Sequence, residues 1–154
     1  MKRRAILLMC LALISFPTSA ANERATKEEA IAFVNRAMAY IKANSKEKAL
    51  AEFNDPKGTF IDRELYVVAL DLQGNVLAHG ANHKLVGKNL MQIRDLDGKY
   101  FVQEQIEIAN KKGSGWTEFR WNNPVLNKME MRQFYLVRNE DYLIGAGIFK
   151  PSEK

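Results

Sequence analysis

Residues 66–79 read Y-V-V-A-L-D-L-Q-G-N-V-L-A-H and carry the strongest structural signal in the chain. Two apolar runs rich in strand-forming residues flank Gly74-Asn75. Both residues of that pair tolerate the positive φ that a tight hairpin turn requires. The stretch therefore predicts a β-hairpin that begins near Leu65 and ends at His79.

Three further strands are predicted toward the C-terminus, over residues 116–121, 129–138 and 142–149. Short runs containing Asn, Pro, Glu and Asp separate them, so consecutive strands must be antiparallel. Gly145-Ala146-Gly147 within the last strand, like Gly113-Ser114-Gly115 before the first, is expected to allow a turn or a bulge.

A loop and a helix are predicted between the hairpin and these strands. Residues 80–95 have no clear period, and ordered loops of this length are usually functional. A helix is expected from about Lys99 to Asn110, with Asp97 as its cap and Gly113 just beyond its end.

A long or broken helix is predicted at the N-terminal side of the hairpin. Thr26 and Glu29 form a capping box, and apolar residues follow at helical spacing. Asn44-Ser45 interrupts this helix, and Pro56 ends the helical region. The elements together predict an α+β domain, with a central antiparallel sheet of about five strands, a long N-terminal helix, and a loop and helix over one face.

The first 20 residues have the pattern of a secretory signal peptide. Lys2, Arg3 and Arg4 precede an apolar run, and small residues follow it. Cleavage is expected after Ala20, with Ala21 as the alternative. The run is shorter than the roughly 20 apolar residues that a membrane span needs. We therefore predict residues 1–20 as a signal peptide and residues 24–150 as one exported domain, periplasmic or secreted, without stable membrane insertion.

The composition of the mature chain excludes several classes of function. Cys10 is the single cysteine and lies within the signal peptide, which removes disulfides and thiol chemistry. Loss of three of the 23 basic residues lowers the net charge from +5 to +2. No basic stripe with interleaved aromatic residues indicates nucleic acid.

Motifs for catalysis, metals or cofactors are weak. His79 and His83 have metal-ligand spacing only on a helix, and the glycines and asparagines around them indicate a strand end and a loop. No G-x-S-x-G motif is present. We expect no metal, no cofactor and no enzymatic activity.

Arg132 is the most informative candidate for a binding residue. It lies between apolar residues on a predicted strand, and a buried unpaired cation is costly. A guanidinium can hold a carboxylate with two hydrogen bonds, and tyrosine hydroxyls can complete the site. Because side chains alternate along a strand, Trp116 and Trp121 should face opposite sides, as should Arg132 and Tyr135. The candidate ligand-binding residues are Tyr66, His79, Tyr100, Trp116, Trp121, Arg132 and Tyr135.

The ordered motifs from Thr26 to Phe149 resemble the single Cache domain (type 2), a PAS-like extracytoplasmic sensor family. The matching pieces are D-x-x-G-x-V-x-A-H at 71–79, G-K-N-L at 87–90, D-x-x-G-K-Y-F at 95–101, G-x-G-W at 113–116, W-x-N-P at 121–124 and I-G-A-G-I-F at 144–149. The family often has K-x-x-Y where this chain has Arg132 to Tyr135. That difference changes the head group that would meet a ligand.

The resemblance implies a pocket between the sheet and the long loop, and a small carboxylate as ligand. Such domains normally belong to chemoreceptors or sensor kinases, so a separate membrane-bound partner of that kind is expected. Two other functions remain open: a ligand-free interaction module that docks on a membrane sensor or receptor, and an uncharacterised hydrolase.

Overall fold

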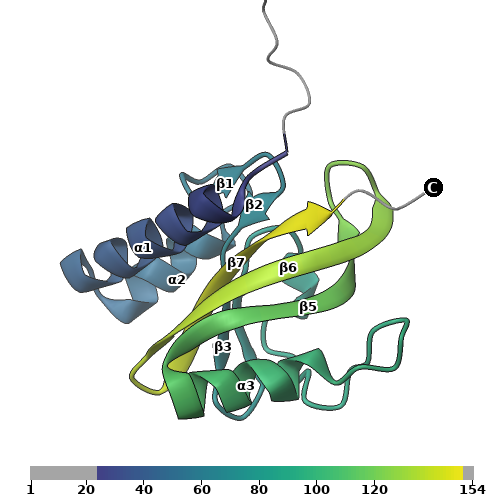
Figure 1. Cartoon of the computed structure of the whole chain (residues 1–154). Helices are drawn as coiled ribbons and strands as arrows, with labels where there is room; N and C mark the ends of the chain where they lie inside the picture. The colour runs from purple at the N-terminus through teal and green to yellow at the C-terminus, as the bar shows by residue number, and fades with distance from the viewer. Residues whose placement is uncertain (1–23, 151–154) are drawn as a thin grey trace, which may run out of the picture.

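A five-stranded antiparallel sheet forms the centre of the domain (Figure 1). The computed structural model describes residues 24–150. The strand order is β4-β3-β7-β6-β5. Its members are β3 (Val68–Asp71), β4 (Val76–His79), β5 (Ser114–Asn123), β6 (Lys128–Asn139) and β7 (Tyr142–Lys150). The last three form the consecutive hairpins that their sequence predicts, and the β3–β4 hairpin packs at the other edge.

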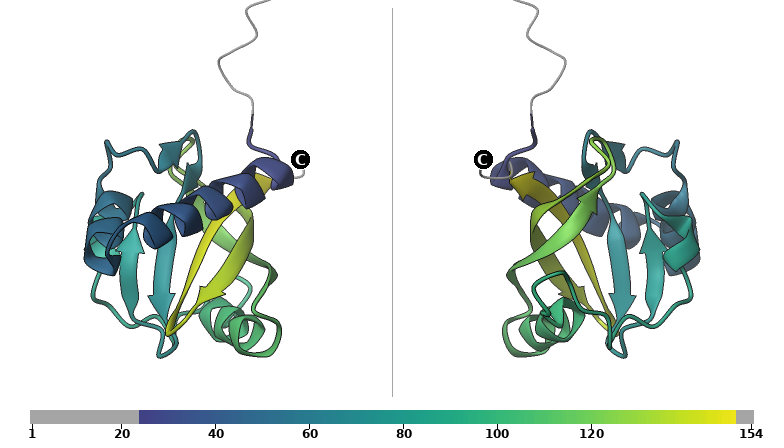
Figure 2. Two further views of the ribbon diagram at one scale, coloured as in Figure 1. Left: turned by 90° about the vertical axis from the view of Figure 1, so that its left-hand side faces the viewer. Right: turned by 90° about the vertical axis from the view of Figure 1, so that its right-hand side faces the viewer.

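Helices α1 (Lys27–Ala43) and α2 (Lys46–Asn54) cover one face of this sheet (Figure 2). The capping box is present, because Thr26 accepts from the amide of Glu29 and Glu29 accepts from the amide of Thr26. The predicted break is also confirmed. Asn44 ends α1, and the Ser45 hydroxyl caps α2 by accepting from the amide of Lys48.

The opposite face of the sheet is covered by the loop after His79 and by α3 (Phe101–Lys112). The loop contains one short helix, η1 (His83–Leu85), and its apolar side chains pack on the same core cluster as α3. Within residues 24–150, none of the helices combines the length and the apolar character needed to cross a bilayer.

Three local predictions were wrong. Helix α3 begins at Phe101, and Asp97 accepts from the Arg120 side chain instead of capping the helix. The predicted strand from Leu65 is divided in two, with β2 (Leu65–Tyr66) pairing with β1 (Ile61–Asp62) and β3 joining the main sheet. Gly145 and Gly147 lie inside β7, in regular pairing with β6. They therefore produce neither a turn nor a bulge.

Candidate functional site

A small cavity lies between the sheet and the first turns of α3. The sheet contributes its floor and one wall, and α3 supplies Phe101, Val102 and Gln105. The complete lining is Val68, Leu70, His79, Phe101, Val102, Gln105, Phe119, Trp121, Arg132 and Phe134. None of these described lining residues belongs to the loop 80–95. That loop supports the site from behind, by packing Leu85 to Ile93 on the core cluster that also includes Tyr66 and Phe134.

The cavity is narrow. The volume open to the centre of a water molecule is about 20 Å³. By the same measure, one water molecule needs about 10–15 Å³. Six of the lining residues are apolar, and the others present N–H groups. A ligand of this cavity would have few non-hydrogen atoms and at least one polar acceptor.

Arg132 is the charged group of the site. Its side chain is 2% exposed, and its Nε and Nη2 have no hydrogen-bond partner among residues 24–150. The guanidinium carbon instead lies 4.3 Å from the centre of the Tyr66 ring, 5.0 Å from that of Phe134 and 5.4 Å from that of Phe149. Burial lowers the pKa of Arg132 from its ordinary value, while the neighbouring Tyr66 hydroxyl opposes that change. Among residues 24–150, no carboxylate pairs with this buried cation.

Gly147 of β7 makes room for that cation, and Gly145 makes room for the neighbouring Phe134 ring. A methyl group on Gly147 would lie 2.9 Å from Nε of Arg132, and one on Gly145 would lie 2.3 Å from the Phe134 ring. Both distances are shorter than real contacts allow. Glycines are therefore needed in the G-A-G run because large side chains of β6 lie across it. The sequence of β7 alone does not reveal this requirement.

Polar groups from two other elements converge on the same region. The Tyr66 hydroxyl on β2 is buried and has no hydrogen-bond partner among the described residues. Burial raises the pKa of Tyr66, while Arg132 and Trp121 both act on its hydroxyl in the opposite direction. Tyr66 packs on Arg132 and is not itself a lining residue of the cavity. Its hydroxyl, the Trp121 indole N–H and the Arg132 guanidinium form a neighbouring set of donors, which suits a negatively charged acceptor.

His79 adds a neutral ring. It lies between Tyr66 and Trp121, with ring centres 5.0 Å and 6.5 Å away. Its Nδ1 accepts from the amide of Asn82 at 3.0 Å, so Nε2 carries the proton of the neutral ring. Burial, reinforced by the Arg132 charge, lowers the pKa of His79 to about 3. At neutral pH the ring offers a donor and adds no charge.

The structure brings four of the seven predicted site residues together: Tyr66, His79, Trp121 and Arg132. Trp116 and Tyr135 lie on the other face of the sheet, where they contact each other with ring centres 5.2 Å apart and pack on the α1 side. The predicted alternation of the two tryptophans, and of Arg132 and Tyr135, is therefore observed. Tyr100 precedes α3 and accepts from Arg94, outside the cavity lining.

Gln105 is a lining residue that the sequence did not single out. It is 2% exposed and lies on the buried side of α3 among apolar residues. Its Nε2 has one long contact, 3.5 Å to the Thr117 hydroxyl. The signal in the sequence was an amide side chain at an apolar position of the predicted helix, just as Arg132 is a charged side chain among apolar residues of β6.

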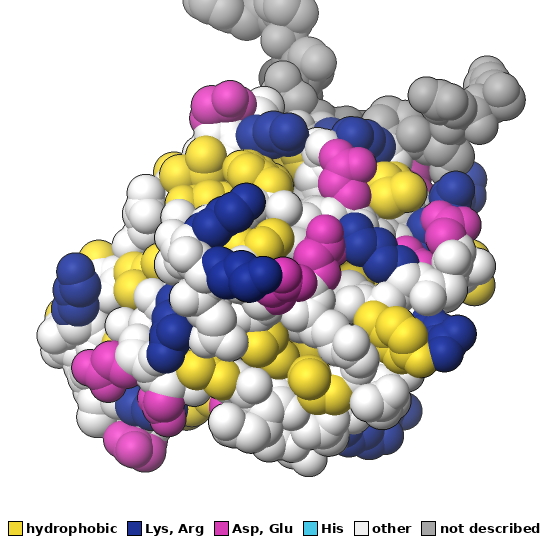
Figure 3. Space-filling view, turned by 60° about the horizontal axis from the view of Figure 1, so that its bottom comes forward, with side chains coloured by type: hydrophobic (Ala, Val, Ile, Leu, Met, Phe, Trp, Pro, Cys, Tyr) yellow, Lys and Arg dark blue, Asp and Glu magenta, His cyan; other side chains and the backbone are white. Residues whose placement is uncertain are grey.

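Charges on the outer surface are mixed. Figure 3 shows basic, acidic and apolar side chains interspersed on the face toward α3, without a stripe of one sign. This face therefore offers no charged surface patch as a binding site, and the buried Arg132 remains the candidate charged group.

An antiparallel sheet with helices on one face, and with a loop and helix over a cavity on the other, defines a PAS-like α+β domain. A family model described as "Cache domain" matches residues 56–149, which is more than half of the chain. The chain belongs to the Cache domain family. The predicted family and fold class are both confirmed.

Individual relatives point the same way. The chain is 29% identical over 90 residues to the methyl-accepting chemotaxis protein McpP of Pseudomonas putida, a match that covers 57% of this chain and 16% of that protein. This chain thus corresponds to a small part of that relative.

Solved structures agree in fold. A methyl-accepting chemotaxis protein from Vibrio parahaemolyticus superposes with a TM-score of 0.71 at 24% identity, over 80% of this chain and 87% of that one. A Cache chemosensory domain studied for carboxylic acid recognition gives a TM-score of 0.62 at 22% identity, over 80% and 88%. At these identities the likeness establishes the fold alone.

Proposed function

We propose that this protein is an extracytoplasmic sensor domain that binds a small organic carboxylate, and that a separate membrane-bound chemoreceptor or sensor kinase reads its state. The observation that carries the proposal is the Arg132 guanidinium, which is buried in an aromatic cage with Nε and Nη2 unpartnered among the described residues. Burying a charge without a partner costs several kcal/mol, so a structural role alone does not account for it. A carboxylate would supply the missing acceptors.

The surroundings of Arg132 limit the ligand to a short acid. Phe101, Phe119 and Phe134 surround the cavity with apolar surface, and the room available is that of a few atoms. Acetate, propionate, pyruvate and lactate are the smallest organic acids of this kind, and each would have to push the cavity walls apart to enter a space of one or two water molecules. The description of one similar domain as recognising carboxylic acids supports the same choice.

A binding role is favoured over a catalytic one by the state of the polar groups. His79 is neutral and its Nδ1 already accepts from the amide of Asn82, which leaves no basic nitrogen facing the cavity. A general base would need such a nitrogen or a carboxylate within reach of the substrate. The side chains around the cavity instead offer donors, as the binding of an anion requires.

Export through residues 1–20, with cleavage after Ala20 or Ala21, is part of this proposal and lies outside the described residues. It is supported by the pattern of basic, apolar and small residues. Mass spectrometry of the protein recovered from a bacterial periplasm would locate the mature N-terminus, and recovery of intact residues 1–20 there would contradict it.

The ligand is tested by calorimetry and thermal shift with residues 24–150. The panel pairs each short acid with its uncharged amide, for example propionate with propionamide. We expect at least one acid to raise the melting temperature in proportion to the logarithm of its concentration, while its amide does not. Equal effects of acid and amide, or no effect of any acid at millimolar concentration, would contradict the proposal.

The second candidate, a ligand-free interaction module, has a different signature. The tip of the β5–β6 hairpin exposes Val125, Leu126 and Met129, and such side chains suit contact with another protein. That function predicts binding to a membrane sensor with no effect of any acid on the isolated domain.

A further inference from the structure

Two carboxylates hold the first described residues of the chain, and each lies two residues before one member of the Arg132–Tyr66 pair. Glu130 accepts from both terminal nitrogens of Arg24, each at 2.9 Å. Glu64 accepts from the amide of Ala25 at 2.9 Å. Glu130 lies two residues before Arg132 on β6, and Glu64 lies immediately before β2, two residues before Tyr66. The same short segments therefore position the pocket and hold residues 24 and 25.

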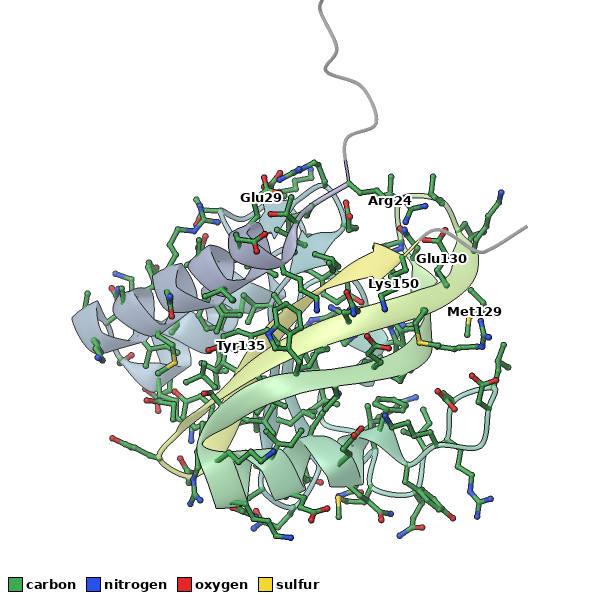
Figure 4. The ribbon with its side chains drawn as sticks, viewed as in Figure 1. Arg24, Glu29, Met129, Glu130, Tyr135 and Lys150 are labelled. Carbon is green, nitrogen blue, oxygen red and sulfur yellow. The ribbon has the colours of Figure 1, made fainter. Side chains whose placement is uncertain are left out.

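A third bond joins residue 24 to the strand opposite Arg132. Nη1 of Arg24 also donates to the carbonyl of Phe149, at 3.1 Å. Phe149 is the direct partner of Arg132 in the β6–β7 pair, and its ring is one of those around the guanidinium. Figure 4 shows Arg24 and Glu130 together at the end of the sheet where the chain enters the domain.

The two carboxylates are well shielded from water, whereas the Arg24 side chain is 30% exposed. Glu130 is 3% exposed and Glu64 is 4% exposed. Asn123 also donates to Glu130, at 2.8 Å, which fixes the carboxylate on the strand. Movement of β6 at Arg132 is thus passed to Arg24 through short, partly buried bonds to a carboxylate that is itself buried.

The capping box extends the connection into α1. Arg63, next to Glu64, has a positive φ of 55° and pairs with Glu29 at 2.8 Å. Glu29 is the residue that caps the amide of Thr26. The β1–β2 turn therefore holds both Ala25, which precedes the N-cap of α1, and the first turn of the helix.

We infer that the pocket is coupled to this N-terminal segment: an anion that bridges Arg132 and Tyr66 ties β6 to β2 and tightens the hold of Glu130 and Glu64 on Arg24 and Ala25. The inference rests on the proposed ligand site. Once ligand binding has ordered both segments, the contacts to Arg24 and Ala25 form with a smaller loss of conformational entropy. Ligand binding and these contacts therefore favour each other. Coupling is reciprocal, so releasing Arg24 must also lower the affinity for the ligand.

The amide of Ala25 is the direct reporter, because its hydrogen bond to Glu64 is one of the contacts in question. Hydrogen exchange of residues 24–150 is measured without ligand and with the acid that raises the melting temperature most. We expect about fivefold or more additional protection at Ala25, the lower end of usual couplings. Ligand binding that leaves Ala25 exchange unchanged would overturn the coupling while the proposed function stands.

Two variants separate this coupling from simple electrostatics. Arg24→Met removes a cation and Glu130→Gln removes an anion, so long-range charge effects on an anionic ligand have opposite signs. Coupling predicts that both variants weaken the acid, again by about fivefold. Lys46→Met, which removes the surface pair with Asp141 elsewhere on the domain, is the matched control and should leave the affinity unchanged. Weaker binding in Arg24→Met together with stronger binding in Glu130→Gln would overturn the inference.

A measurement without ligand keeps the inference testable if no acid in the panel binds. The Nε–H of Arg132 is buried, and its exchange can be followed by nitrogen-15 NMR. Coupling predicts that this proton exchanges faster in Arg24→Met than in the parent or in Lys46→Met. Equal exchange in all three would reject the coupling, whereas faster exchange with no ligand found would reject only the proposed function.

Discussion

The guanidinium of Arg132 lies over the ring of Tyr66, 4.3 Å from its centre, and the Tyr66 hydroxyl has no hydrogen-bond partner among the described residues. The negative face of the ring compensates part of the charge, by about 2 kcal/mol when water is excluded. It leaves the N–H groups of Nε and Nη2 without an acceptor among the described residues. The pair is therefore half of a binding site, complete on the aromatic side and open on the acceptor side.

Arg132→Met should stabilise the domain and abolish carboxylate binding. Methionine fills a similar volume without a buried charge, so the free energy of unfolding should rise by about 1–3 kcal/mol. Urea unfolding and calorimetry measure the two effects. Arg138→Met, at an exposed position near the end of the same strand, is the control. It loses hydrogen bonds to Asn110 and to the carbonyl of Glu140, so it should gain no stability, and it should bind the acid as the parent does. A clear loss of stability in Arg132→Met would assign the arginine a structural role instead.

Tyr66→Phe should weaken the ligand and leave the fold intact. A hydrogen bond to a charged group contributes about 1.5–3 kcal/mol, so the dissociation constant should rise at least tenfold. Tyr135→Phe removes the same hydroxyl from the opposite face of the sheet. Its dissociation constant should equal that of the parent, and an equal loss in both variants would place the ligand elsewhere.

Gly147→Ala should damage both stability and binding. The added methyl group would lie 2.6 Å from the carbonyl oxygen of Gln133 and 2.9 Å from Nε of Arg132, so the guanidinium must move. Overpacking of this kind costs about 1–3 kcal/mol. Gly115→Ala, whose methyl group would meet the flexible side chain of Ile108, is the comparison. It should retain the parent affinity for the acid, and equal loss of affinity in both variants would contradict the role of Gly147.

His79 should make the domain less stable as the pH falls below 6.5. Its pKa is about 3 when folded and 6.5 in the reference state. Between pH 6.5 and pH 3, the unfolded chain therefore binds a proton at His79 that the folded chain does not bind. The stability is fully present above pH 6.5 and is lost toward pH 3, by roughly 1.4 kcal/mol for each pH unit.

Urea unfolding between pH 7 and pH 5 measures this slope, a range that lies above the titration of the carboxylates. His79→Gln should lose most of the slope, and His83→Gln, at an exposed loop position, should retain it. A His79 ring that titrates near pH 6.5 by NMR would show the prediction to be wrong.

Residues close together in the sequence determine much of the architecture. The capping box at Thr26, the interruption at Asn44-Ser45, and the Gly-Asn turn before Val76 each depend on residues within a few positions of one another, and each is present in the structure. Strand alternation placed Trp121 and Arg132 correctly on the faces opposite Trp116 and Tyr135. Local rules also misplaced the start of α3, because Asp97 found a partner on β5 that no local pattern contains.

The pocket itself was decided by tertiary contacts. The sequence alone identified an arginine that needed a partner, a set of aromatic residues and the ordered motifs of a Cache domain. Only the folded sheet laid Arg132 across Gly147, brought Tyr66 beneath it from a separate strand, and directed Glu130 to Arg24 instead of to its neighbour. Those choices depend on which strands lie side by side, and pairing between distant segments is set by the free energy of the whole core rather than by any single stretch of residues.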